Sequence, residues 1–256
     1  MQLTILGCSG SLAAPGNPGS SYLVTLADST SIVMDLGPGS LAALEGAQNP
    51  SDAHVVFSHL HADHCSDFIS LLIWRQYHPE MAARSRNLMF GPTYAPEHFG
   101  RMGGNGPSDI IDFSDTLAFG PWVPHQKELL GSATITPFPV LHPAQESYAL
   151  RVEESNTGKV LTYSGDTAYT QELVDAARGA DVFLCEAAWG PSSEGMAPDM
   201  HMSGGEAGRV AREAGVNTLV LVHIQPWADK EETAAAAAKE FDGDIIVGYP
   251  GQVLDV

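Results

Sequence analysis

His59-Leu60-His61-Ala62-Asp63-His64 places four potential metal ligands within six residues. The segment directly follows Ala53–Phe57, an apolar run that predicts a buried β-strand. A turn at the end of such a strand can point neighbouring side chains toward one place. Imidazole nitrogens and carboxylate oxygens suit zinc, manganese and iron, and no paired thiolates lie nearby. The segment therefore predicts part of a catalytic metal centre.

Three more candidate ligands follow other predicted strands: His142, Asp166 and His223. A lone histidine is usually an ordinary core or surface residue, and an HxH pair is common by chance. Recurrence at strand ends weakens that interpretation here. Because parallel strands end at the same edge of a sheet, their loops can converge. The expected centre has five histidines, two aspartates and room for two metal ions.

The remaining pattern alternates short apolar strands with turns, and helices become frequent in the last third. Strands are expected at Gln2–Gly7, Ser21–Leu26, Ser31–Asp35, Ala53–Phe57, Leu88–Phe90, Thr134–Val140, Tyr148–Glu153, Lys159–Tyr163, Val182–Cys185, Thr218–Val222 and Ile245–Val247. Helices are expected at Ser40–Leu44, Phe68–Trp74, Ala95–Met102, Gln171–Arg178, Gly204–Ala214 and Lys230–Phe241, with Asp67, Ser203 and Asp229 as N-caps.

The opening motif resembles the HxHxDH signature of the metallo-β-lactamase superfamily. The similarity spans nearly the whole chain, through Leu6–Ser11, Val33–Gly37, Ser164–Thr167 and Leu221–His223. It implies an α/β fold, a four-layer αββα sandwich of the metallo-β-lactamase type, which agrees with strands followed by helices in both halves. We expect a single domain over residues 1–256, in which about 79–131 is a less typical excursion.

The composition is that of an ordinary globular chain with a strongly acidic surface. Of 256 residues, 44% are hydrophobic, and 31 Asp and Glu against 12 Lys and Arg give a net charge of −19. This charge repels nucleic acids and anionic lipid surfaces. No apolar run approaches the roughly 20 residues that span a bilayer. With three scattered cysteines and no signal-peptide pattern, we expect a cytoplasmic protein that does not bind membranes.

The resemblance also implies how the ligands divide between two divalent ions. One ion would be bound by His59, His61 and His142, the other by Asp63, His64 and His223, with Asp166 bridging. Zinc is the first choice, and manganese and iron stay open. Two such ions, two carboxylates and a hydroxide leave about one positive charge, which favours a phosphodiester substrate. Asp35 would orient a metal-bound histidine, although a simple turn aspartate is equally compatible with its position.

Two further segments resemble the ribonuclease Z branch of the superfamily: Phe183–Ala187 and His201–Ala207. In that branch a glutamate and a histidine assist proton transfer, which implies this role for Glu186 and His201. A leaving alkoxide needs a proton, and a histidine oriented by a carboxylate can deliver it. The expected catalytic residues are therefore Asp63, Glu186 and His201. The alternative is that Glu186 and His201 are a strand-end charge and a helix-cap neighbour.

The chain departs from transfer-RNA-processing ribonuclease Z between His142 and Asp166. This segment predicts one hairpin with a turn at Ser155–Gly158, so the long RNA-gripping arm usually inserted there is absent. Four lysines and the acidic surface argue against a long RNA partner. Basic residues concentrate only at Arg75, Arg84, Arg86 and Arg101. Each of them is more typical of a solvated outer helix face or loop than of a site that binds a phosphate and a base, and we assign none to the site.

Three segments resemble a compact actinobacterial-type group associated with cyclic nucleotide phosphodiesterase activity: Leu60–Cys65, Trp74–Pro79 and Cys185–Trp189. The expected function is hydrolysis of a small phosphodiester, first of all a 3′,5′-cyclic nucleotide such as cAMP. The alternatives are a ribonuclease Z-like RNA nuclease, a thioester or lactone hydrolase and, from another class, a metal-dependent sensor. The apolar helix at Phe68–Trp74 and the resemblance leave a homodimer open.

Overall fold

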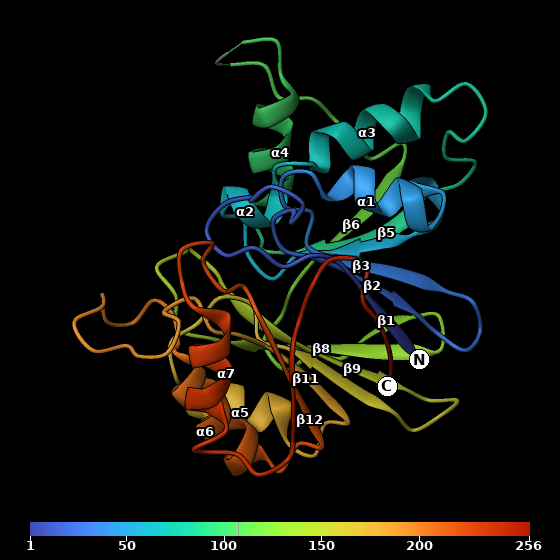
Figure 1. Cartoon of the computed structure of the whole chain (residues 1–256). Coiled ribbons are helices and arrows are strands. Elements are labelled where there is room, and N and C mark those ends of the chain that lie inside the picture. Colours follow the sequence, from blue (N-terminus) through green and yellow to red (C-terminus); the bar gives the residue numbers. More distant parts are fainter. Residues whose placement is uncertain (107) are drawn as a thin grey trace.

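Two seven-stranded β-sheets lie face to face in the computed structural model, which describes residues 1–106 and 108–256 (Figure 1). The first sheet has the order β14 (Val253–Asp255), β1 (Gln2–Gly7), β2 (Ser21–Thr25), β3 (Ser31–Met34), β4 (His54–Val56), β5 (Asn87–Gly91) and β6 (Leu117–Pro121). The second has the order β13 (Asp244–Val247), β12 (Thr218–Val222), β11 (Val182–Glu186), β10 (Val160–Tyr163), β9 (Tyr148–Glu154), β8 (Ala133–Pro139) and β7 (Glu128–Leu130).

Helices cover the outer faces of both sheets. They are α1 (Ser40–Ala47), α2 (Ala62–Cys65), α3 (Phe68–Tyr77), α4 (Ala95–Gly103), α5 (Gln171–Ala177), α6 (Gly204–Ala214) and α7 (Lys230–Ala237), with a 3₁₀ turn at Pro50–Asp52. In Figure 1, α1, α3 and α4 lie outside the first sheet, and α5, α6 and α7 lie outside the second. This confirms the expected four-layer αββα sandwich.

Strand β11 illustrates why these sheets are buried on both faces. Val182 and Leu184 join the core between the two sheets, and the alternate residues Phe183 and Cys185 pack under the helices of the second sheet. Side chains of a strand point alternately to its two faces, so a strand covered on both sides is apolar throughout. The same pattern made the strands visible in the sequence.

The parallel parts of the sheets determine where the candidate ligands gather. Strands β3 to β6 are parallel in the first sheet, and β10 to β13 are parallel in the second. Strand β8 runs in the same direction as β10, because each pairs antiparallel with β9. The loops that follow β4, β8, β10 and β12 carry all seven candidate ligands. They leave from the carboxyl ends of these strands.

Several short elements differ from the sequence expectations. β6, β7, β14 and α2 were not predicted, and α7 ends at Ala237 rather than Phe241. Three of the four are strands at sheet edges, where pairing with one neighbour orders a segment that has little strand propensity of its own. Residues 79–131 supply α4, β5 and one edge strand of each sheet, β6 and β7.

No helix in the described part of the chain is long and apolar enough to cross a membrane. The exposed side chains of Ile73 and Tyr77 lie on α3. The homodimer stays a prediction.

Candidate metal centre

The opening motif forms the exit from β4 and the single turn of α2. His59 lies on the exit, His61 directly precedes the helix, and Asp63 and His64 lie within it. Two glycines let neighbouring loops pack against the backbone of this turn. A Cβ atom at Gly37 would lie 2.1 Å from the Asp63 carbonyl oxygen, and one at Gly19 2.6 Å from it. Side chains at these positions would displace α2.

Seven side chains from both sheets converge here in two groups, as the sequence predicted. One group offers nitrogen atoms of His59, His61 and His142, and the other offers ligand atoms of Asp63, His64, Asp166 and His223. Within each group these atoms lie within 4.8 Å of one another. The arrangement matches the division expected from the resemblance.

Asp166 lies between the two groups. Its Oδ2 atom is 3.8 Å from His59 Nε2 and 3.9 Å from His142 Nε2, on the side of the first group. The same oxygen is 3.4 Å from His223 Nε2, and Oδ1 is 3.1 Å from His64 Nε2. Asp166 therefore lies within 4 Å of nitrogen atoms of both groups.

The hydrogen bonds around the first group fit a bound cation. His142 Nδ1 lies 2.7 Å from the carbonyl oxygen of Met200, to which it donates, so its proton is on Nδ1. The lone pair of Nε2 then faces His61 Nδ1 at 3.0 Å. His59 Nε2 is buried without a hydrogen-bond partner among the described residues. Three imidazole nitrogens that converge at one point, one of them buried without a hydrogen-bond partner, form a donor set that suits a divalent metal ion.

Asp35 organises the second group. It is fully buried at the end of β3 and accepts hydrogen bonds from Ser58 N at 2.8 Å, Ser58 Oγ at 2.7 Å, His64 Nδ1 at 2.8 Å and Tyr163 Oη at 2.9 Å. In the neutral form of His64, this contact leaves the Nε2 lone pair facing His223 Nε2 at 3.2 Å. These contacts favour the orienting role for Asp35 over a turn aspartate.

The charges of the second group also call for a cation. Burial opposes protonation of His64, but Asp166, Asp63 and Asp35 outweigh burial and raise its pKa well above the usual value. Burial opposes ionisation of Asp63 as well, yet His64 and His223 lower its pKa. In the metal-free chain a proton thus holds part of the positive charge that a metal ion would supply. Metal binding at His64 therefore competes with protons.

Glu186 is a fully buried carboxylate whose oxygens are held by four donors. It accepts backbone hydrogen bonds from Thr167 at 2.9 Å, Ala188 at 2.9 Å and Met202 at 3.3 Å, and its Oε1 lies 2.8 Å from His201 Nδ1. Together these donors hold the Glu186 carboxylate in one orientation. The pairing of Glu186 with His201 expected from the sequence is present in the structure.

His201 faces the candidate ligands from the second sheet. Burial would lower its pKa, but the Glu186 carboxylate outweighs burial and raises the pKa to about 9. Its ring centroid is 5.0 Å from that of His142 and 5.5 Å from that of His223. His201 also belongs to two further groups of potential ligands, one with His142 and Asp166 and one with Glu186 and His223. The geometry is therefore compatible with proton donation and with metal ligation.

Comparison with known proteins identifies the family. Residues 30–224 match the family described as "Beta-lactamase superfamily domain". The chain belongs to the metallo-β-lactamase superfamily. An uncharacterized protein of Mycobacterium leprae is 42% identical over 256 residues, which are 100% of this chain and 89% of that protein.

Two named relatives indicate the kind of chemistry. The probable metallo-hydrolase YhfI of Bacillus subtilis is 27% identical over the full length of both proteins. Its crystal structure superposes with a TM-score of 0.87 at 24% identity and covers 99% of this chain and 98% of its own. Ribonuclease Z of Halobacterium salinarum is 35% identical over 107 residues, 41% of this chain and 35% of that protein. This metallo-β-lactamase superfamily member is a metal-dependent hydrolase.

Two of the four clustered arginines, Arg75 and Arg101, make contacts within the protein. Arg75 is buried and donates hydrogen bonds to Thr116 Oγ1 at 2.8 Å and to the Ser51 carbonyl oxygen at 2.9 Å. Arg101 pairs with Glu97 on the same helix at 2.8 Å. Arg75 thus ties α3 to the edge of the first sheet and is not available to a substrate.

Sequence reasoning missed three partners of the metallo-β-lactamase centre: Ser58, Tyr163 and the carbonyl group of Met200. Ser58 directly precedes His59, which is a weak signal. The other two give no sequence signal. Every residue has a backbone carbonyl group, so Met200 does not stand out, and Tyr163 is distant in sequence from Asp35, which it contacts.

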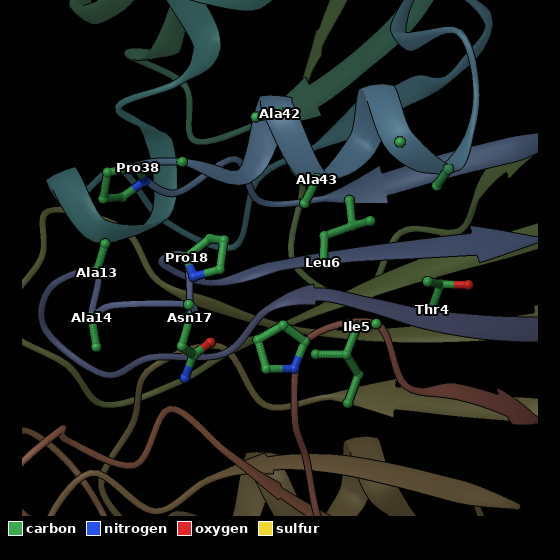
Figure 2. Close-up of a pocket in the computed structure, with 16 residues that line it drawn as sticks. Thr4, Ile5, Leu6, Ala13, Ala14, Asn17, Pro18, Pro38, Ala42 and Ala43 are labelled. Atoms are coloured by element: carbon green, nitrogen blue, oxygen red, sulfur yellow. The ribbon is translucent and has the colours of Figure 1, made fainter.

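A sizeable groove lies apart from the candidate metal centre. Figure 2 shows a groove of about 760 Å³ beside α1, where Leu6, Pro18, Pro38 and Ala43 surround it. Its lining is mainly apolar and includes none of the candidate ligands. The groove is therefore not the reaction centre.

Proposed function

We propose that this chain is a dinuclear phosphodiesterase that hydrolyses a small phosphodiester, first of all a 3′,5′-cyclic nucleotide such as cAMP. The observation that carries the proposal is a buried Glu186–His201 pair beside two ligand groups with Asp166 between them. Phosphodiester hydrolysis needs charge stabilisation at phosphorus and a proton for the leaving oxygen. This arrangement offers both.

The proposed ligands are those expected from the sequence. His59, His61 and His142 would hold one ion, and Asp63, His64 and His223 would hold the other, with Asp166 available to both. Two divalent ions, zinc by preference with manganese and iron as alternatives, would activate water and stabilise negative charge on the phosphate. Asp63 is counted among the catalytic residues because it would hold one of these ions together with His64 and His223.

His201 is the proposed general acid. The contact between its Nδ1 atom and Glu186 leaves Nε2 free to give a proton to the leaving oxygen. A pKa of about 9 keeps the imidazolium form present at neutral pH. A thioester hydrolase releases a thiolate, which leaves without a proton more readily than an alkoxide does. The Glu186–His201 pair therefore favours a phosphodiester over a thioester.

The connection from His142 to Asp166 supports a small substrate. It consists of β9 and β10 joined by a tight turn in which Gly158 N donates to the Glu154 carbonyl oxygen at 2.8 Å. This hairpin offers no arm that could grip folded RNA, and the net charge of −19 repels a polyanion. The relative named ribonuclease Z keeps an RNA nuclease as the second candidate function.

The test is to compare kcat/KM of zinc-loaded protein on cAMP, bis(p-nitrophenyl) phosphate, a precursor transfer RNA and an acyl thioester. We expect turnover of both small diesters and a higher kcat/KM on cAMP than on precursor transfer RNA or the thioester. A higher kcat/KM on precursor transfer RNA than on cyclic nucleotides would replace the proposal by the RNA nuclease. Turnover of the thioester alone would make the chain a thioester hydrolase.

A further inference from the structure

Two buried tyrosines lie side by side between the sheets, and only one of them contacts the candidate centre. Tyr22 belongs to β2 and Tyr163 ends β10, with ring centroids 4.9 Å apart. The Tyr163 hydroxyl donates to Asp35 Oδ2 at 2.9 Å. The Tyr22 hydroxyl makes no hydrogen bond of normal geometry within residues 1–106 and 108–256, although Ser20 lies near it. The chain thus contains a matched pair of phenols in one environment.

Asp35 Oδ2 is the shared acceptor of three side-chain hydrogen bonds, one of them from Tyr163. It lies 2.7 Å from Ser58 Oγ, 2.8 Å from His64 Nδ1 and 2.9 Å from Tyr163 Oη. Asp35, Ser58 and His64 all follow strands of the first sheet, whereas Tyr163 belongs to the second. Tyr163 therefore supplies the hydrogen bond that joins this carboxylate to the opposite sheet.

The same tyrosine lies three residues before the candidate bridging ligand. Asp166 follows the end of β10, and its Oδ1 atom is 3.1 Å from His64 Nε2. The Tyr163 hydroxyl thus holds the end of β10 against the carboxylate that orients His64. One hydrogen bond constrains both His64 and the strand exit that leads to Asp166.

We propose that Tyr163 is a positioning residue of the metal centre. It acts through Asp35, keeps His64 Nε2 and Asp166 Oδ1 at a common point, and touches no substrate. The inference rests on the metal-binding roles proposed above for His64 and Asp166. The test of Tyr163 measures metal affinity rather than hydrolysis. A wrong role for Tyr163 can therefore be told apart from a wrong substrate.

Two single substitutions test the role of Tyr163. Tyr163→Phe removes the donor and keeps the ring, and Tyr22→Phe makes the same change on the neighbouring phenol. In a competition titration with a zinc chelator, Tyr163→Phe is expected to weaken one of two zinc-binding steps by about 10-fold, the lower end for loss of a ligand's hydrogen-bonding partner. Tyr22→Phe should bind both ions as the unchanged protein does. Equal affinities in all three proteins, or equal losses in the two variants, would overturn the proposal.

Cobalt substitution separates a change of ligand geometry from a change of stability. The visible absorption of Co²⁺ depends on coordination geometry, so Tyr163→Phe should shift or broaden the bands and Tyr22→Phe should leave them in place. In an Asp35→Ala background, the further change Tyr163→Phe should cost less than twofold in zinc affinity, because the oxygen that accepts the Tyr163 hydrogen bond is gone. An additional 10-fold loss there would show that Tyr163 does not act through Asp35.

A measurement on the unchanged chain covers the case in which Tyr163→Phe fails to fold. The hydroxyl proton of Tyr163 is buried and hydrogen-bonded, so it should exchange slowly and give a separate proton resonance. Addition of zinc to the metal-free protein should shift this resonance, because zinc at His64 would polarise the hydrogen bond from His64 Nδ1 to Asp35 Oδ2, the oxygen that also accepts from Tyr163. A Tyr163 hydroxyl resonance that does not respond to zinc would contradict the proposal.

Discussion

His201 and its neighbours use their ring nitrogens in different ways. His142 donates Nδ1–H to a neutral carbonyl group, whereas His201 pairs Nδ1 with the buried carboxylate of Glu186. A neutral acceptor leaves the imidazole uncharged and ready to bind metal, and a carboxylate stabilises the imidazolium. These partners fit the roles proposed for His142 and His201. A carboxylate partner does not by itself decide the role, because His64, a proposed ligand, also directs its Nδ1 atom at a carboxylate, that of Asp35.

The leaving group of the substrate provides the first prediction. His201→Ala should retain both metal ions and slow cyclic nucleotide hydrolysis by about 10²–10⁴-fold, the usual contribution of a general acid. A p-nitrophenolate departs without a proton, so the same variant should lose far less activity on bis(p-nitrophenyl) phosphate. Steady-state kinetics on both substrates, with elemental analysis, decides the matter. Equal losses with intact metal content would remove the general-acid role, and loss of an ion would make His201 a ligand.

The second prediction concerns pH. His201 has a raised pKa of about 9, so its acid form is present below that pH and is lost as the pH rises through it. The rate of cyclic nucleotide hydrolysis should therefore fall above about pH 9. Glu186→Gln removes the carboxylate that raises this pKa, so the alkaline limb of the kcat profile should move to lower pH. If the alkaline limb stays at the same pH in Glu186→Gln, the limb does not report the ionisation of His201.

At the scale of single residues, the ligands could be predicted from sequence and their partners could not. His142, Asp166 and His223 each follow an apolar strand, so their positions were visible without a structure. The contact of Tyr163 with Asp35 depends on how two sheets pack across 128 positions of sequence, which no local pattern encodes. The Met200 carbonyl that binds His142 carries no residue signal at all.

Helix starts show which local rules hold and where tertiary contacts override them. Ser203 caps α6 through a capping box with Glu206, as its sequence indicates. Asp67 stands at the N-cap position of α3, but its side chain accepts a hydrogen bond from Leu41 N at 2.9 Å and makes no cap. The cap predicted for Asp67 was wrong because the start of α1 lies within reach of the same carboxylate.

Asp181 carries the prediction at the scale of elements, since it joins the starts of β10 and β11. Its carboxylate accepts hydrogen bonds from Lys159 Nζ at 2.8 Å and from Val160 N at 2.9 Å. Burial opposes ionisation, but these bonds outweigh it and lower the pKa of Asp181. Asp181→Asn should reduce the free energy of unfolding at pH 7 by roughly 0.5–1.5 kcal/mol, the contribution of a typical hydrogen bond.

The sign of its pH dependence follows from the lowered pKa. The stabilisation by Asp181 is fully present above the unfolded pKa of about 4 and is lost as the pH falls through the folded pKa. Urea unfolding at pH 7 and in steps toward pH 2.5 should therefore show the difference between the unchanged protein and Asp181→Asn shrink with acid. Glu45→Gln, on exposed α1, is the control. A difference that stays constant over this range would show that ionisation of Asp181 adds no stability.

At the scale of the whole molecule, the candidate centre lies across the seam between the sheets. The loop after β4 comes from the first sheet, and the loops after β8, β10 and β12 come from the second. The core between the sheets also draws on strands from both. Ions bound by all four loops would therefore join the two halves of the sequence. We propose on this ground that residues 1–256 form a single domain.

Metal removal tests that arrangement. Elemental analysis should find two ions per chain, and fewer in Asp63→Ala.

The effect of metal on stability is a second measurement. Each ion stabilises the folded state by about 2.7 kcal/mol when free metal is 100-fold above its dissociation constant, so chelation should lower the unfolding temperature. One transition should remain in calorimetry, because the core between the sheets persists without metal. Zinc should still raise the unfolding temperature of His201→Ala by the full amount, but that of His142→Ala by less. Two separate transitions would contradict the single domain. If zinc does not change the unfolding temperature of the unchanged protein, the proposal that metal ions bind loops of both sheets is wrong.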